Sequence, residues 1–163
     1  MTMRKTLIAP GIALGIVVAA LSVPTFAQTA KALQLEGYVK VEKVIVDERG
    51  ERRTELVEPL TVVPGDRLVM GTSYVNGGSS LIENFVISNP VPSAVRVSEV
   101  ADPAQIVSLD GGRSWAPFAK QIVREADGTV RQAVPGDITH LRWTIPTVAP
   151  GSGGTVEYAA TVR

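Results

Sequence analysis

The chain of 163 residues is long enough for one domain of ordinary size, and 45% of its residues are hydrophobic, which is enough for a core. Its 16 basic residues balance its 16 acidic residues. This balance argues against a dedicated nucleic-acid binder, because such a protein needs a basic surface to displace the counterions of the phosphates. Cysteine is absent, which excludes disulfides, thiol catalysis and cysteine-ligated metals.

The first 27 residues have the order of a secretory signal peptide. Arg4 and Lys5 precede a charge-free apolar run, and Thr25 and Ala27 are small enough for the −3 and −1 sites of signal peptidase. The run is near or below the length of a membrane span and is interrupted by proline and glycine, although an uncleaved anchor is the alternative. We expect cleavage after Ala27, a periplasmic or cell-surface location, and no transmembrane segment after cleavage. Loss of Arg4 and Lys5 would leave 14 basic against 16 acidic residues.

Residues 28–59 are predicted to form a linker and a β-hairpin that packs on, or leads into, the following domain. Apolar β-branched residues alternate with charged ones at the start of residues 38–47, as expected of a half-buried strand. Gly50 supplies the turn, and residues 52–57 supply the partner strand.

Residues 60–163 read as a series of short strands separated by turns. Pro-Gly-Asp turns at residues 64–66 and 135–137 precede predicted strands at 67–75 and 138–145. Asn76-Gly77-Gly78 is predicted to be a bend between strands. It is not a phosphate cradle, because no lysine and no helix follow it. Roughly nine strands with a turn every 8–12 residues, and no helical stripe, predict an all-β sandwich or barrel.

Several of these motifs together resemble the conserved repeat domain, a family of unknown function found in bacterial surface and secreted proteins. The resemblance begins with the Pro-Gly-Asp turn at 64–66, Tyr74, the turn at 76–78 and the Asn-x-x-Pro ending at 89–92. It continues through "VSLDGGRSW" and through "ITHLRWTIPTVAPGSGGTVEYAATV", which contains Trp143. It covers about residues 60–163.

The resemblance implies an immunoglobulin-like Greek-key β-sandwich over residues 60–163. The hairpin within residues 38–57 stands outside the resemblance and would be an addition at the N-terminus. Members of the family usually repeat this domain within long cell-surface or wall-associated chains, whereas these 163 residues hold one copy. The family offers no catalytic residues to carry over.

Candidate catalytic and metal-binding residues are few. His140 is the only histidine, so it cannot form a histidine-rich zinc site, and no serine lies in a G-x-S-x-G elbow. Asp110-Gly111-Gly112 and Asp127-Gly128 lack the spacing of a calcium loop and are typical of turns with positive φ. We therefore predict neither an enzyme nor a cofactor or metal site.

The two tryptophans give the most specific binding hypothesis. Trp143 alternates with Leu141 and is expected to fill the core, whereas Trp115 either closes one end of the sandwich or binds a ligand. A ligand-binding site would consist of Trp115, Asp110 and Arg113, since exposed aromatic rings can stack on sugars.

The sequence thus predicts an exported, non-enzymatic β-sandwich that acts as an interaction or structural module of the periplasm or cell surface. Its partner would be an unidentified protein or another envelope component. The alternative is a carbohydrate- or small-ligand-binding module that uses exposed aromatic and loop residues.

Overall fold

The structure, a computed structural model, describes residues 33–163, and the predicted signal peptide lies outside this range. The described residues form eleven β-strands, all paired antiparallel, and two short 3-10 turns. No α-helix occurs among them. The predicted all-β class is confirmed, with two more strands than the roughly nine expected.

The larger sheet has five strands in the order β2-β1-β3-β11-β5. Their bounds are Arg52–Val57 (β2), Leu33–Val46 (β1), Arg67–Asn76 (β3), Gly153–Val162 (β11) and Val95–Val97 (β5). β1 is long enough to have two partners: its first part, to Val41, pairs with β3, and its last part, from Val41, pairs with β2. The first strand of the hairpin is thus the continuation of the strand that pairs with β3 in the larger sheet.

The smaller sheet has four strands in the order β4-β10-β6-β7, and a separate ribbon joins β8 to β9. The bounds are Ile82–Pro90 (β4), His140–Val148 (β10), Ile106–Ser108 (β6), Ala116–Pro117 (β7), Ile122–Arg124 (β8) and Val130–Gln132 (β9). The 3-10 turns are Phe118–Lys120 (η2) and Pro135–Asp137 (η3). The second Pro-Gly-Asp motif is therefore a helical turn directly before β10.

Apolar side chains from both sheets meet in one core. Val41, Leu68 and Ala160 contribute from the larger sheet, and Val107 and Leu141 from the smaller sheet, and all five are buried. The register explains this: cross-strand partners Val41 and Leu68 lie on the same face, and every second residue follows them.

The tryptophan prediction is met only in part, because Trp143 is half-buried and packs against the edge of this core. The buried aromatic residue is Tyr158, which was not singled out from the sequence. Its hydroxyl donates to the Pro90 carbonyl of the opposite sheet at 3.4 Å.

One end of the molecule is closed by Asn76, which is fully buried. Its Nδ2 donates to the carbonyls of Ser80 at 2.8 Å and Val148 at 2.9 Å, and its Oδ1 accepts from the Gly78 amide at 3.0 Å. Its backbone also bonds with the turn after β10, through Gly151 and Ser152. The Asn-Gly-Gly segment is thus the predicted bend, and one side chain ties it to the end of the other sheet.

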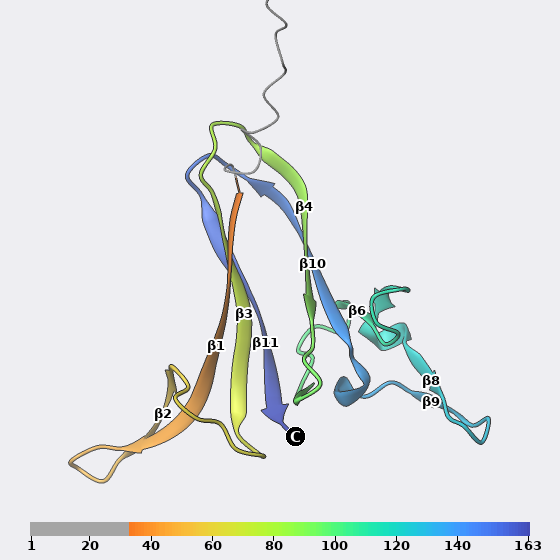
Figure 1. Ribbon diagram of the computed structural model, residues 1–163, viewed down its shortest axis with the longest axis horizontal. Coiled ribbons are helices and arrows are strands. Elements are labelled where there is room, and N and C mark those ends of the chain that lie inside the picture. The colour runs from red at the N-terminus through yellow and green to blue at the C-terminus, as the bar shows by residue number, and fades with distance from the viewer. Residues whose placement is uncertain (1–32) are drawn as a thin grey trace, which may run out of the picture.

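The opposite end spreads into two projecting ribbons (Figure 1). The β1–β2 hairpin extends at the lower left of the view and the β8–β9 ribbon at the lower right. Two-stranded ribbons have little core of their own, so their stability depends on how they are tied to the body. We call them the first arm (residues 42–57) and the second arm (residues 122–132).

Gly71 in β3 leaves room for the side chain of Tyr38 on the outer face of the larger sheet. A Cβ at Gly71 would lie 2.6 Å from the ring of Tyr38, which crosses the glycine to donate a hydrogen bond to Glu157. Burial first, and then this hydrogen bond to the carboxylate, raises the pKa of Tyr38. The side chain thus links β1 to β11 across the strand between them.

The described part of the chain contains no helix with the length and hydropathy needed to cross a membrane.

The role of Asn76 gives a first prediction. Asn76→Ala leaves one buried carbonyl, and a part-buried carbonyl and amide, without this partner, so the free energy of unfolding should fall by on the order of 3 kcal/mol. Asn76→Asp should cost at least as much, because a carboxylate would face two carbonyl oxygens. Urea unfolding of both variants measures this. Ser79→Ala, an exposed change in the same turn, is the control and should stay within about 0.5 kcal/mol of the parent; an equally small loss for Asn76→Ala would contradict the role.

Candidate functional site

The three residues predicted to bind a ligand lie in one turn between β6 and β7. Asp110 is its centre: Oδ1 accepts from the amides of Arg113 at 3.0 Å and Ser114 at 2.9 Å and from the Ser108 hydroxyl at 2.7 Å. Oδ2 accepts from the Ser114 hydroxyl at 2.7 Å. The carboxylate is therefore directed at its own loop.

These bonds favour the charged form of Asp110. The Ser114 amide and hydroxyl, followed by the Ser108 hydroxyl, hold the pKa of this carboxyl well below its usual range. Gly111 and Gly112 have φ values of 79° and 85°, a region that residues with a Cβ rarely adopt. The sequence Asp-Gly-Gly is thus explained by turn geometry.

Arg113 belongs to the same turn and also points back to it. Its Nε donates to the Asp110 carbonyl oxygen at 2.8 Å, and the residue is exposed. No group of three or more histidine, cysteine or acidic side chains that could hold a metal ion occurs within residues 33–163.

Trp115 lies half-buried over the smaller sheet. Its Nε1 donates to the Gly112 carbonyl at 2.9 Å, and its ring meets the His140 ring edge-on at 6.1 Å between centroids. The guanidinium of Arg142 lies 3.6 Å from the centroid of the indole ring. One face of the indole is thus covered by a cation and cannot stack on a sugar at the same time.

Arg142 is the functional candidate that sequence reasoning missed. Its Nε donates to the Ser88 hydroxyl at 3.2 Å, which fixes the guanidinium between β4 and the Trp115 ring. Alternation along β10 places Arg142 on the same face as His140. Only the pairing of β10 with β6 and β4 shows that Trp115 and Ser88 lie beside it. That pairing is not visible in the sequence.

His140 is the first residue of β10. Its Nδ1 lies 3.2 Å from the Thr139 hydroxyl, and its ring packs edge-on against Trp115.

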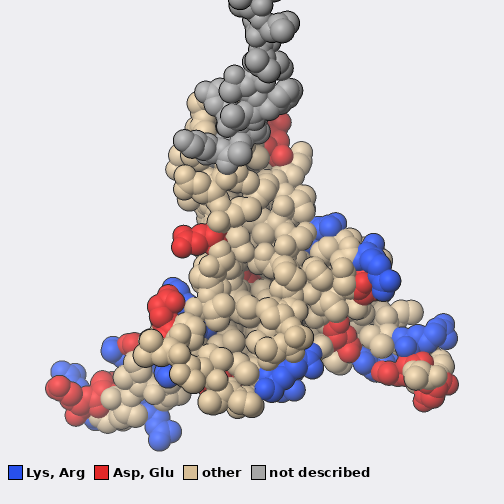
Figure 2. Space-filling model, viewed as in Figure 1, with Lys and Arg blue, Asp and Glu red and all other residues tan. Residues whose placement is uncertain are grey.

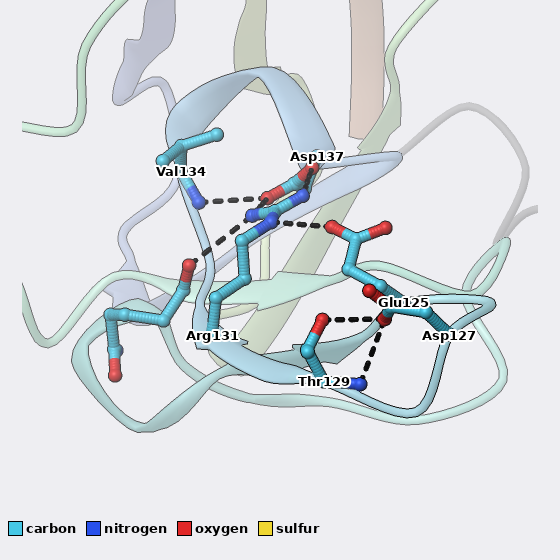
Figure 3. Close-up of polar contacts among 7 residues, drawn as sticks. Glu125, Asp127, Thr129, Arg131, Val134 and Asp137 are labelled. Carbon is cyan, nitrogen blue, oxygen red and sulfur yellow. Dashed lines mark hydrogen bonds and ion pairs between the residues drawn. The ribbon is translucent and has the colours of Figure 1, made fainter.

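The second arm is held to the body by Arg131 (Figure 3). Its guanidinium bonds with both oxygens of Asp137, at 2.7 and 2.9 Å, and with Glu125 at 2.6 Å. Asp137 also accepts from the Val134 amide at 2.8 Å. The hydrogen bonds that Arg131 donates to Asp137, and then the one to Glu125, raise the pKa of Arg131. This ion pair joins the ribbon to η3.

Both arms expose large apolar side chains. On the first arm Val44, Val46 and Leu56 share one face, and the exposed fraction of Val44 is 64%. On the second arm Ile122, 60% exposed, and Val130 share one face. Charged side chains gather at the tips of both arms (Figure 2).

Two shallow clefts open between the sheets. The larger, about 280 Å³, is lined by Val39, Thr72, Asn89 and Pro90 among others, and the smaller, about 210 Å³, by Glu99, Asp102, Trp143 and others. Both volumes lie below the roughly 300 Å³ at which pockets for small organic ligands usually begin. Neither cleft therefore has the usual size of a small-molecule site.

No family model, no curated protein and no solved structure matches this chain. The resemblance to the repeat domain of bacterial surface proteins stays a prediction from the motifs.

The Asp110 turn gives a second prediction. Asp110→Ala removes the acceptor of four hydrogen bonds, so the turn should loosen and the emission of Trp115 should shift to the red, measured in a Trp143→Phe background. Asp127→Ala removes a similar turn carboxylate on the second arm, bonded to Thr129, and should leave the emission unchanged.

The same fluorescence should respond to acid. Because the pKa of Asp110 is lowered by folding, the carboxylate stabilises the turn above the ordinary aspartate range, near pH 4. This stabilisation is lost as the pH falls below that range, so the parent should show the red shift on acidification and Asp110→Ala should not. An identical acid response in both proteins would contradict the role of the carboxylate.

Proposed function

We propose that this protein is an exported, non-enzymatic β-sandwich that acts as an interaction module of the periplasm or cell surface. The observation that carries the proposal is the apolar face on each projecting arm. Isolated exposed apolar side chains are ordinary, but several on one face of a projecting ribbon are typical of a protein contact surface.

The first arm supplies the larger of the two faces. Val44 and Val46 lie two residues apart on β1 and so point to the same face. Leu56 on β2 points to this face too, because it pairs with Glu42, two residues before Val44. Glu42, Thr54 and Arg52 flank these residues on the same face, and the opposite face carries Lys43, Ile45, Arg53 and Glu55. The three exposed apolar side chains therefore stand among polar groups on an arm that has no core to cover. An apolar face kept on a projecting ribbon favours a partner that covers it.

The charged tips are consistent with selective contact. Charged residues at the edges and ends of strands oppose uncontrolled strand pairing between molecules. In the first arm, Arg53 and Glu55 form an ion pair at 2.7 Å on the edge strand β2. Such an edge disfavours indiscriminate aggregation while the apolar face stays available.

Export is proposed from the order of charges and apolar residues in the first 27 residues, with cleavage after Ala27. For the fold type, we propose the immunoglobulin-like Greek-key arrangement implied by the repeat-domain resemblance. Its support is that β3 and β11, far apart in the chain, are neighbours, while the consecutive strands β3 and β4 lie in different sheets.

A non-enzymatic role fits the engagement of the polar groups. Asp110 is used by its own turn, His140 contacts Thr139 and Trp115, and Asp137 is used by Arg131. For the carbohydrate-binding alternative, the covered face of Trp115 removes the main support that the sequence gave it.

A photo-crosslinking experiment tests the proposal. A photoreactive amino acid is placed at Val44 or Ile122 in the native cell, and at Thr155 as a control on the outer face of the larger sheet, where the side chain is also exposed. We expect adducts of the same discrete size with the exported protein at one or both arm positions, and none at Thr155.

The result that would contradict the proposal is equal labelling at all three positions, or none at the arms. N-terminal sequencing of the protein recovered from the envelope fraction tests export in the same experiment, and Gln28 is the expected first residue.

A further inference from the structure

We propose that Arg142 anchors a carboxylate-binding site on the outer face of the smaller sheet, and that its ligand is an extended acidic peptide segment of a partner protein. The inference rests on the proposed interaction function and names the chemistry of the partner at a surface separate from the arms.

The guanidinium of Arg142 is held in one place before any ligand arrives. The indole ring of Trp115 lies 3.6 Å from it, and the Ser88 hydroxyl accepts from Nε at 3.2 Å. Trp115 is itself fixed by its bond to the Gly112 carbonyl. An arginine ordered in this way loses less side-chain entropy on binding, and so its hydrogen bonds contribute more to affinity.

This ordered cation has no anion. Arg53 pairs with Glu55, Arg67 with Glu42, and Arg131 with both Glu125 and Asp137. Among residues 33–163, no carboxylate lies within ion-pair distance of Arg142, and its Nη1 and Nη2 groups have no hydrogen-bond acceptor. The nearby turn carboxylate of Asp110 is bonded to Ser108, Arg113 and Ser114.

The two terminal amino groups of Arg142 favour a carboxylate as the ligand. A guanidinium presents parallel N–H groups that match the two oxygens of a carboxylate, and such charge-assisted pairs are stronger than neutral hydrogen bonds. With Nε occupied by Ser88, the two terminal amino groups are the ones that a carboxylate would meet.

The neighbouring strand edge favours a peptide. Among the strands of residues 33–163, β4 is the outermost of its sheet. The Val91 amide donates to the Thr139 carbonyl. Because antiparallel bonds alternate, the backbone groups of Val86 and Ser88 point away from β10, toward the free edge. An extended peptide can pair with these groups while an acidic side chain reaches Arg142.

The same edge limits the length of the pairing. Asn84 has a positive φ of 51°, which interrupts the extended backbone. At the other end Pro90 has no amide hydrogen to donate. Only Val86 and Ser88 lie between these interruptions with edge-facing groups, so strand pairing alone is short and the carboxylate contact has to supply much of the selectivity.

Selection from a random-sequence peptide display library tests this inference on the full, processed chain. We expect peptides selected by the parent protein to be enriched in aspartate or glutamate at one position. Arg142→Gln should abolish that enrichment. Arg142→Lys should weaken it, since lysine keeps the charge and loses the planar pairing. Arg96→Gln is the matched control: this exposed arginine lies on β5 of the larger sheet, outside both arms, and its removal should leave the enrichment unchanged.

A selected peptide then gives the affinity. Replacement of its acidic residue by the matching amide should weaken binding to the parent protein about tenfold or more, and should not affect binding to Arg142→Gln. Thermal unfolding of each variant verifies that the fold is retained.

Three results would overturn the inference: no peptides selected by the parent, peptides without acidic enrichment, or equal enrichment with Arg142→Gln. Binding of an oligogalacturonate that depends on Arg142, without peptide binding, would instead assign the carboxylate to a sugar and overturn the peptide class. Discrete photo-crosslinks at Val44 or Ile122 together with any of these results would leave the proposed interaction function standing and remove only this site.

Discussion

The buried side-chain amide of Asn76 is the constraint on which the rest of the structure depends. It lies at the end of β3, where the chain leaves the larger sheet for the smaller one, and it bonds both to the turn that begins there and to the last residue of β10. A buried amide is stable only when its donors and acceptor are all satisfied. Here each of them has a partner, so the two sheets are joined at one end by a fixed geometry rather than by apolar contact alone.

With one end closed in this way, the other end can spread. The apolar core lies between the sheets, and beyond it β1 and the β8–β9 segment continue as ribbons with little of their own to bury. The second arm keeps its place because Arg131 has two acidic partners, and the first arm because β1 is continuous with the larger sheet. A packed body with projecting ribbons that expose apolar side chains would suit the proposed contact function.

The sequence predicted where strands and turns occur, but it did not predict which strands pair with one another. Alternation and Pro-Gly-Asp turns located β3 and β10 to within a few residues, because period-two patterning and turn chemistry are local properties. Asp110 was placed in a turn for the same reason. The contact between Arg142 and Trp115 was missed, since it depends on which strands pair, and the burial of Tyr158 was missed because its strand reads like the others. The half-exposed position of Trp143 shows that residue type alone does not decide which aromatic side chain fills a core.

Hydrogen exchange of the native protein, followed residue by residue, tests the central role of Asn76 most directly. The backbone amides of Asn76, Gly78 and Gly151 should exchange only through global unfolding, with the same free energy as the core strand amide of Leu141. The amides of Lys43 and Val123, in the arms, should exchange through local opening at lower free energy. Exchange at Asn76 and Gly78 as fast as in the arms would show that this end of the molecule opens independently, and would contradict the account.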